Sequence, residues 1–448
     1  MNYDIYNSVF SHRYGSEEMR KIFGEQHKYE IWRKIWVALA TAQAEIGKVS
    51  KEELEDLVKN QNNINIDRIL EIEKETRHDV VAGIREFAEV AKVGGGKIHL
   101  GATSMDINDN GDILKMNEAL AIIETKLKGV LGEFKNKIDQ YADMVCIGFT
   151  HLQPAEPTTV GYRMAFYAQD LLSDLKLLEF IKTNIKGKGM KGAVGTGASY
   201  DRGVDEKVME ILGIEGALVT SQIVSRQMEY WVLTLLSSIA NSLAKFAGDL
   251  RILQSPLFGE WSEPFAEKQV GSSAMPFKRN PINAEKLCSL ARFITQTVPV
   301  VIGNQAVSYL ERTLDDSANR RIVIPEAFLA CDEVLETANK LIGGLVINEK
   351  KITHNLSQYA PFAATERIIL EAVKLGADRQ KMHELIRDIS MQAWSEIQDG
   401  KENRILELLM EQEEIKKLFD KSELEKLFDV SGHVGDAPER ARKCAKII

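Results

Sequence analysis

The feature that most constrains the fold is a series of long segments with helical periodicity, while strand-like alternation is nearly absent. The longest segment, Gln222–Leu253, would be about 45 Å long as a helix that rises about 1.5 Å per residue. Its apolar residues lie on more than one face, so neighbouring elements must cover it on several sides. We therefore predict an all-α chain whose long helices form a bundle shared between the subunits of a homo-oligomer.

Two breaks in this helical pattern divide the chain. The first is Lys92–Lys97, and the second, Asn348–Pro361, separates the long segments from a tail of shorter ones. We predict three domains: an N-terminal helical domain (residues 1–105), a central bundle of long helices (106–354) and a C-terminal helical domain (355–448). The remaining segments with helical periodicity are Tyr29–Ile46, Gly111–Tyr141, Val160–Ile185, Pro281–Val301 and Ile322–Leu345.

Charge and cysteine usage narrow the possible functions. The net charge of −9 argues against a general nucleic-acid binder, but local clusters of Arg and Lys can still bind an anionic small molecule. The four cysteines form no C-x-x-C pair, which favours reduced thiols over disulfides or a zinc site. The sequence begins without the apolar run of a signal peptide, and no apolar stretch is long enough to span a bilayer. We therefore predict a cytoplasmic protein without nucleic-acid or membrane partners.

The segment Ser255–Pro281 is the strongest candidate for chemistry. It lies between two long helical segments, and loops of this length without regular structure are usually functional or disordered. The tripeptide Gly-Ser-Ser at 271–273 offers closely spaced backbone amides and two hydroxyls, and Lys278 and Asn280 add a cation and an amide donor. These groups could hold a carboxylate and stabilise negative charge that develops on it. The residues alone leave this interpretation and a flexible, solvated surface loop about equally open.

The string Gly271-Ser-Ser-Ala-Met-Pro-Phe-Lys-Arg-Asn-Pro281 resembles the signature loop of the fumarase/aspartase superfamily, in which a mobile loop supplies a catalytic serine. Further motifs, spread over nearly the whole chain, are similar to those of the adenylosuccinate lyase family within that superfamily. These motifs are Arg13-Tyr14, Thr76-Arg77-His78-Asp79-Val80, His99-Leu-Gly-Ala-Thr103-Ser104, Thr150-His151-Leu-Gln153-Pro154-Ala155, Gln222, Leu310-Glu311-Arg312, Ser317-x-x-x-Arg321, Ala364-Thr365-Glu366-Arg367 and Gly376-x-Asp378-Arg379-Gln380.

The resemblance implies both a fold and a reaction. The implied fold is a three-domain, all-α fumarase/aspartase-like fold, with a central bundle shared in a homotetramer and active sites built from more than one subunit. The implied reaction is the release of fumarate from adenylosuccinate to give AMP, and from the succinylated aminoimidazole carboxamide ribonucleotide in purine biosynthesis. No cofactor and no metal are expected. Two alternatives stay open: a 3-carboxymuconate-type cycloisomerase of the same superfamily, which should lack a phosphate site, and a homologue that has lost activity and serves a structural role.

The resemblance also implies catalytic roles. Ser272 is expected to remove the proton from the carbon next to a carboxylate, while Lys278 and the loop amides stabilise its alkoxide. His151 is expected to protonate the departing nitrogen, because the pKa of an imidazole lies near neutral, and Glu285 is expected to orient it. His78 is placed among the catalytic residues without an assigned proton transfer.

The implied substrate carries two carboxylates and a phosphate, groups that guanidinium side chains and hydroxyls bind well. The role of His99 in proton transfer is left open. The expected substrate-binding residues are Arg13, Tyr14, Arg77, Asp79, His99, Thr103, Ser104, Gln222, Asn280, Arg312, Ser317 and Arg321.

Two further patterns do not indicate function. Gly187–Gly192 fits G-x-G-x-x-G, but no strand–helix–strand pattern surrounds it, so a dinucleotide site is not expected. The histidines show neither H-x-x-x-H nor H-x-H spacing, which leaves metal binding without support.

Overall fold

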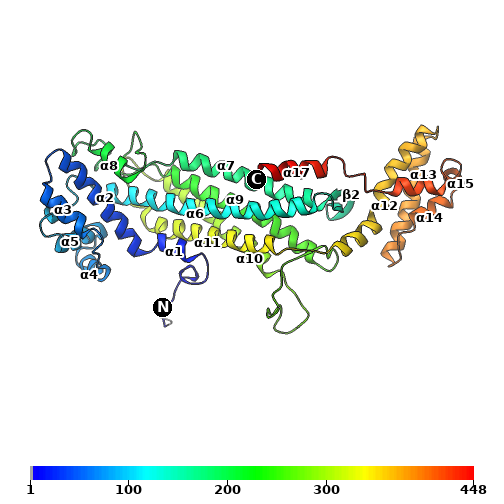
Figure 1. Ribbon diagram of the computed structural model, residues 1–448, viewed down its shortest axis with the longest axis horizontal. Helices are drawn as coiled ribbons and strands as arrows, with labels where there is room; N and C mark the ends of the chain where they lie inside the picture. The colour runs from blue at the N-terminus through cyan, green and yellow to red at the C-terminus, as the bar shows by residue number, and fades with distance from the viewer. Residues whose placement is uncertain (1–3) are drawn as a thin grey trace. The chain divides into compact units, whose positions relative to one another are not determined.

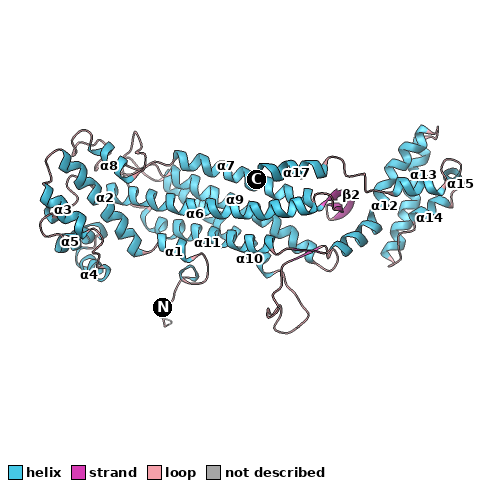
Figure 2. Cartoon of the chain, viewed as in Figure 1, coloured by secondary structure: helices cyan, strands magenta, loops and turns pink. Residues whose placement is uncertain are grey.

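The computed structural model describes residues 4–448, and helices make up most of them (Figure 2). The all-α prediction is confirmed for this part of the chain. Two compact units are present: unit 1 comprises Met1–Leu127, Ser173–Asn241 and Ser289–Glu336, and unit 2 comprises Lys128–Leu172, Ser242–Cys288 and Thr337–Ile448. Among residues 4–448, no helix has both the length and the apolar character that a membrane crossing requires.

The N-terminal helices of unit 1 pack around the aromatic face of α2. Trp32 and Trp36 of this helix are buried, and the Trp36 ring lies 6.2 Å from that of Phe87. The predicted break at Lys92–Lys97 is confirmed, because the preceding helix ends at Val90 and a short 3₁₀ helix follows. The elements are a 3₁₀ helix Val9–Ser11, α1 (Glu17–Ile22), α2 (Glu25–Glu45), α3 (Lys51–Asn60), α4 (Ile66–Thr76), α5 (Asp79–Val90), a 3₁₀ helix Gly95–Lys97 and α8 (Val204–Leu212) (Figure 1).

Five long helices are present, as the periodicity predicted, and each contributes residues to both units. Helix α9 is buried on several sides, with Leu235, Leu236 and Ile239 fully inaccessible to solvent. Its start differs from the prediction, since the helix begins at Gln227 and residue Gln222 precedes it. The five helices are α6 (Ser104–Tyr141), α7 (Val160–Asn184), α9 (Gln227–Gln254), α10 (Ile282–Ala306) and α11 (Ser317–Gly343).

Helices α13, α14 and α16 in the C-terminal part of unit 2 pack against α12, and here one predicted break is wrong. Helix α12 runs through Pro361, so the expected interruption at Asn348–Pro361 is limited to its beginning, and the proposed boundary at 354–355 falls inside a helix. A proline inside a helix removes one hydrogen bond, but Ala360, Ala364 and Ile368 are buried around it and keep the helix packed. The elements are α12 (Glu349–Lys374), α13 (Arg379–Gln398), α14 (Ile405–Met410), α15 (Glu413–Lys416), α16 (Lys421–Phe428) and α17 (Ala437–Ile447).

A β-hairpin in unit 2 was not predicted. Strand β1 (Val145–Thr150) pairs antiparallel with β2 (Gln153–Thr159), and a bulge interrupts the register between Ile147 and Phe149. The two turn residues, His151 and Leu152, have φ angles of 53° and 59°. This turn normally contains Gly or Asn, so its sequence carried no hairpin signal. A second, shorter pair joins β3 (Trp261–Ser262) to β4 (Val346–Ile347).

Candidate active site

Ser272 lies in the long loop that leads from β3 to α10 (Figure 1). Its hydroxyl oxygen accepts hydrogen bonds from the backbone amides of Ala274 (3.4 Å) and Met275 (3.1 Å). Two amide dipoles therefore point at the oxygen that would carry the negative charge of an alkoxide. Backbone amides are the kind of donor that stabilises a negatively charged oxygen.

The loop closes on itself around Gly271. The carbonyl oxygen of Lys278 lies so near that a Cβ atom added to Gly271 would come within 2.1 Å of it. The side-chain amide of Asn280 donates to the Gly271 carbonyl oxygen at 3.1 Å. The Lys278 side chain is exposed, and its backbone amide donates to the Met275 carbonyl oxygen at 3.1 Å. Glycine is thus required at position 271 for the turn that presents Ser272.

Glu285, in the first turn of α10, faces Arg251 of α9. The Glu285 Oε1 and Arg251 Nη2 atoms are 3.9 Å apart. Both residues line a cavity of about 530 Å³ in unit 2, together with Ser255 and Pro281. Within this chain the ion-pair partner of Glu285 is therefore Arg251, and its expected role in orienting His151 stays a prediction.

His151 occupies the exposed turn of the β1–β2 hairpin, in the left-handed backbone region. Residues other than glycine are rarely found in this region, and when they are, the surrounding structure has to stabilise them. Arg163 of α7 provides such support, since it donates to the Ile147 carbonyl oxygen of β1 (2.7 Å) and to the buried carboxylate of Glu260 (3.2 Å). Leu152, the next residue, has the same left-handed backbone, so both turn residues depend on this support.

A second group of predicted residues lines a cavity of about 340 Å³ in unit 1. Asp79, Arg312, Ser317 and Arg321 all contribute to its walls. The guanidinium of Arg321 pairs with Asp79 at 3.1 Å, which connects α11 to the start of α5. Five cationic side chains and four carboxylates line the cavity, so positive charges outnumber negative ones by one. The charged lining residues are Glu25, Lys28, Glu73, Asp79, Asp112, Lys115, Arg312, Arg320 and Arg321.

His78 lies at the N-terminus of α5, between α4 and α6. Its Nδ1 atom accepts a hydrogen bond from the Val81 amide (3.5 Å), and its Nε2 atom is 3.4 Å from the Ser104 hydroxyl. Arg77, the residue before it, ends α4 with a left-handed backbone (φ 53°) and is exposed. The predicted motif at 76–80 therefore forms a tight helix–helix turn with its polar side chains near the start of α6.

His99 is held as a neutral imidazole. The indole N–H of Trp36 donates to His99 Nδ1 at 3.1 Å, so the proton of the neutral ring must lie on Nε2. Burial lowers the pKa of His99 to about 4, against an opposing effect of Asp106. At neutral pH, His99 is thus a hydrogen-bond donor through Nε2 and carries no charge.

Four other predicted residues in unit 1 lie outside the walls of the 340 Å³ cavity. Arg13 and Tyr14 follow the first 3₁₀ helix, and both of their amides donate to the Val9 carbonyl oxygen. The Gln222 amide donates to the Glu311 carbonyl oxygen at 3.1 Å, which places it beside the motif that contains Arg312. Thr103 precedes α6, and its amide donates to Asp106 at 2.9 Å.

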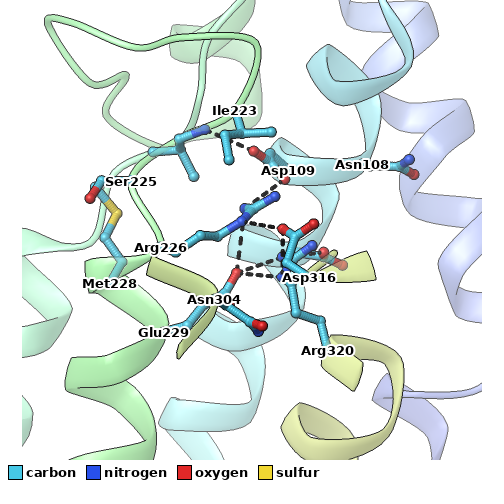
Figure 3. Close-up of polar contacts among 12 residues, drawn as sticks. Asn108, Asp109, Ile223, Ser225, Arg226, Met228, Glu229, Asn304, Asp316 and Arg320 are labelled. Carbon is cyan, nitrogen blue, oxygen red and sulfur yellow. Dashed lines mark hydrogen bonds and ion pairs between the residues drawn. The ribbon is translucent and has the colours of Figure 1, made fainter. Parts of the chain in front are cut away.

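A buried network of charges next to the cavity was missed by the sequence analysis (Figure 3). Arg226 pairs with Asp109 of α6 (3.0 Å) and with Asp316 (2.7 Å). Arg320 of α11 pairs with Glu229 of α9 (2.6 Å). Burial alone would lower the pKa of Arg226, but the surrounding carboxylates outweigh it and raise that pKa.

The network reaches the predicted site through Asp316. The Asp316 carboxylate lies 3.1 Å from the Arg312 guanidinium. In the chain, Asp316 directly precedes Ser317, the first residue of α11. The spacing of Arg226 with Glu229, and of Asp316 with Arg320, places opposite charges on one face of a helix. That spacing was the available signal in the sequence, although it does not distinguish a buried network from a surface ion pair.

Comparison with known proteins identifies relatives along nearly the whole chain. A family model described as Lyase matches residues 12–295, and one described as Adenylosuccinate lyase C-terminus matches residues 361–444. Adenylosuccinate lyase of Saccharomyces cerevisiae is 38% identical, with 99% of this chain and 94% of the relative covered. Adenylosuccinate lyase of Pyrococcus abyssi is 37% identical, with 91% and 90% covered.

Solved structures show the same fold at lower sequence identity. A 3-carboxy-cis,cis-muconate lactonizing enzyme from Pseudomonas putida superposes with a TM-score of 0.89 at 22% identity, covering 98% of each chain. A fumarate lyase from Mesorhizobium sp. BNC1 superposes with a TM-score of 0.86 at 21% identity, covering 99% of each chain. The fumarase/aspartase-like fold predicted from the sequence is thereby confirmed.

Replacement of Gly271 by alanine is expected to lower kcat by roughly 10- to 100-fold, because the added Cβ must push the Lys278 carbonyl away and displace Ser272. Steady-state kinetics measures the effect. Gly432→Ala is the matched control, since its added Cβ has no atom within 4 Å. Unchanged turnover in Gly271→Ala would contradict the requirement for glycine.

Acid is expected to destabilise the protein partly through His99. Burial lowers the pKa of His99 in the folded chain to about 4, whereas the unfolded chain titrates near the ordinary value of 6.5. Between these values the unfolded state binds more protons. The contribution of His99 to the free energy of unfolding is therefore fully present above pH ~6.5 and is lost as the pH decreases towards ~4. Unfolding midpoints at pH ~7 and ~5 should differ less for His99→Gln, which does not titrate, than for the wild type. An equal acid-induced drop in both proteins would refute this contribution.

Proposed function

The chain belongs to the adenylosuccinate lyase family and is a lyase, and we propose that it eliminates fumarate from adenylosuccinate to give AMP through Ser272 as the base. By the same elimination, it acts on the succinylated aminoimidazole carboxamide ribonucleotide of purine biosynthesis. The observation that carries the mechanism is the pair of amide hydrogen bonds to the Ser272 hydroxyl oxygen.

The first half of the reaction removes a proton from carbon. The C–H bond next to a carboxylate breaks, its proton goes to Ser272 Oγ, and the electron pair is delocalised into the carboxylate. A serine alkoxide is normally inaccessible near neutral pH, so the negative oxygen needs stabilisation. The Ala274 and Met275 amides supply it in the loop itself. We assign Lys278 to the same task once substrate is bound, since its ammonium is on the same short turn.

The second half of the reaction breaks the C–N bond. The electron pair returns to form the double bond of fumarate, and the departing nitrogen takes a proton from His151. The turn is exposed, which keeps this imidazole accessible. Arg163 holds the preceding strand β1 through the Ile147 carbonyl oxygen and so restrains the backbone of the turn. Glu285 is paired with Arg251 here, so its orienting role would require that pair, 3.9 Å apart, to open.

We propose that the cavity in unit 1 binds anionic groups of the substrate. Arg312, Ser317 and Arg321 offer guanidinium and hydroxyl donors in its walls. His78 and Ser104 form a hydrogen-bonded pair near the start of α6. His99 acts as a neutral donor rather than as an acid, because its proton lies on Nε2 and its pKa is lowered to about 4.

We infer a homotetramer with active sites shared between subunits, in a cytoplasmic protein. Most soluble oligomers are symmetric assemblies of identical chains. The predicted residues support sharing, because Arg77 and His78 of unit 1 and His151 of unit 2 are all exposed. The four free cysteines are consistent with the cytoplasmic assignment.

The two alternatives receive less support. The likeness to a muconate lactonizing enzyme, at 22% identity, concerns the fold alone, whereas adenylosuccinate lyases reach 38% over nearly the whole chain. A protein without activity would have no need for the strained turn at His151, which destabilises the hairpin relative to a glycine turn.

Replacement of Ser272 by alanine is expected to lower kcat for adenylosuccinate by roughly 10²- to 10⁴-fold, the usual contribution of a general base. Fumarate release, followed by its ultraviolet absorbance, measures it. Ser273→Ala is the matched control, because the amide hydrogen bonds go to Ser272. Release of neither fumarate nor AMP by the wild type would rule out the proposed function, and near-wild-type turnover of Ser272→Ala would rule out the base.

Shared active sites predict that two inactive variants restore each other. Ser272→Ala and His78→Gln, co-expressed with different tags and purified as mixed oligomers, should regain up to about a quarter of wild-type activity, since some sites then receive both intact residues. Each variant alone gives the baseline. Mixed oligomers that stay at this baseline would show that both residues come from the same subunit.

A further inference from the structure

The loop that carries Ser272 is fastened at both ends by two side chains to which neither the sequence motifs nor the family resemblance gave a role. Gln254 is the last residue of α9, and Glu263 follows β3. Both belong to unit 2, as do the loop and the start of α10.

Glu263 fixes the point where the loop enters α10. Its side chain is 6% exposed, and a carboxylate so deeply buried requires hydrogen-bond partners. The Oε1 atom accepts from the Ala284 amide (2.6 Å), and Oε2 accepts from the amide (3.2 Å) and the side-chain Nδ2 (2.9 Å) of Asn283. A negative charge at the N-terminus of a helix is stabilised by the free amides and by the helix dipole. The residue that caps α10 therefore comes from the other end of the loop.

Gln254 joins the same two ends through its side-chain amide. Its oxygen accepts from the Glu263 backbone amide at 2.9 Å, and its nitrogen donates to the Arg279 carbonyl oxygen at 3.0 Å. The entry of the loop at Glu263 and its exit at Arg279 are thus held by one side chain. We call these two residues the Gln254–Glu263 clamp.

The clamp joins the two ends of the segment from Glu263 to Arg279, so this segment forms a closed loop. Ser272 lies within this loop. The contacts of Gly271 with Lys278 and Asn280 bring the two sides of the loop together near Ser272. A base must approach within hydrogen-bond reach of its proton, and an error of about 1 Å lowers the rate about 10²-fold. The distance of Ser272 from the substrate therefore depends on where the ends of the loop are fixed.

We propose that Gln254 and Glu263 are positioning residues for the elimination. They hold both ends of the Ser272 loop so that the serine takes up one position relative to the substrate. This inference rests on the proposed role of Ser272 as the base. The clamp touches no substrate group and acts through the serine. Its loss should affect the proton-abstraction step and leave substrate binding by other residues nearly unchanged.

The test uses Gln254→Met and Glu263→Gln in the full-length protein, with Glu267→Gln as matched control. Methionine keeps the length of glutamine without its hydrogen bonds, and the Glu263→Gln amide can no longer accept through both oxygens. Glu267 is an exposed carboxylate of the same loop. Both clamp variants should lower kcat about 10- to 100-fold while KM changes less than about twofold. The control should keep wild-type values.

Limited trypsin digestion supplies a readout that does not depend on activity. Lys278 and Arg279 lie at the fastened exit of the loop and are exposed, so cleavage there should be several-fold faster in both clamp variants than in the wild type and the control. The double variant should lose little more than the worse single one, because both side chains belong to one clamp.

The possible outcomes distinguish a positioning role of the clamp from a general effect on stability, and its failure from a failure of the proposed function. Unchanged kcat and unchanged cleavage in both variants would overturn the inference, and so would a loss of kcat that only follows a lower unfolding temperature. A rise in KM at constant kcat would also overturn it, since that pattern belongs to a binding residue. If the wild type released no fumarate, the proposed function would fail, and the digestion alone would still decide whether these side chains fasten the loop.

Discussion

The buried charges around Arg226 are the constraint on which the rest of unit 1 depends. An unpaired ion in the interior would be strongly destabilising, so the carboxylates and guanidinium groups of α6, α9 and α11 must meet in one arrangement. Asp316 takes part in this network and in the pair with Arg312, and the helix it precedes carries Ser317 and Arg321. The walls of the 340 Å³ cavity therefore take part of their geometry from this buried network.

Most of the helical architecture could be predicted because helix periodicity is a local property of the sequence. The long helices and the break after Val90 follow from it directly. The prediction failed where long-range packing outweighed a local signal. Pro361 is a helix breaker by itself, yet buried neighbours on both sides keep it within α12. The β1–β2 hairpin failed for the opposite reason, since His151 and Leu152 lack the residue types that mark such a turn.

The sequence motifs predicted which residues belong to the candidate site. They did not predict the contacts that hold these residues in place. Ser272, His151 and Arg312 stand in strings that could be matched in order. Glu263 and Asn283, in contrast, become neighbours only through the folded loop, and no periodicity links them. The pairing of Glu285 with Arg251 was also not predicted, because the two residues are far apart in the sequence and meet only in the fold. Motifs thus nominate candidate reacting groups, while the side chains that hold these groups in place depend on tertiary structure.

The left-handed turn at His151 bears on how this chain can evolve. Each non-glycine residue in that backbone region is disfavoured by roughly 1–2 kcal/mol, so the hairpin is less stable than a turn of Asn and Gly would make it. Random mutation would readily find the more stable turn, at the expense of the imidazole. Arg163, which is paired with Glu260, donates to Ile147 in the strand that leads into this turn. If His151 is the proposed acid, a substitution that stabilises this turn would also remove the acid, so stability and activity oppose each other at this position.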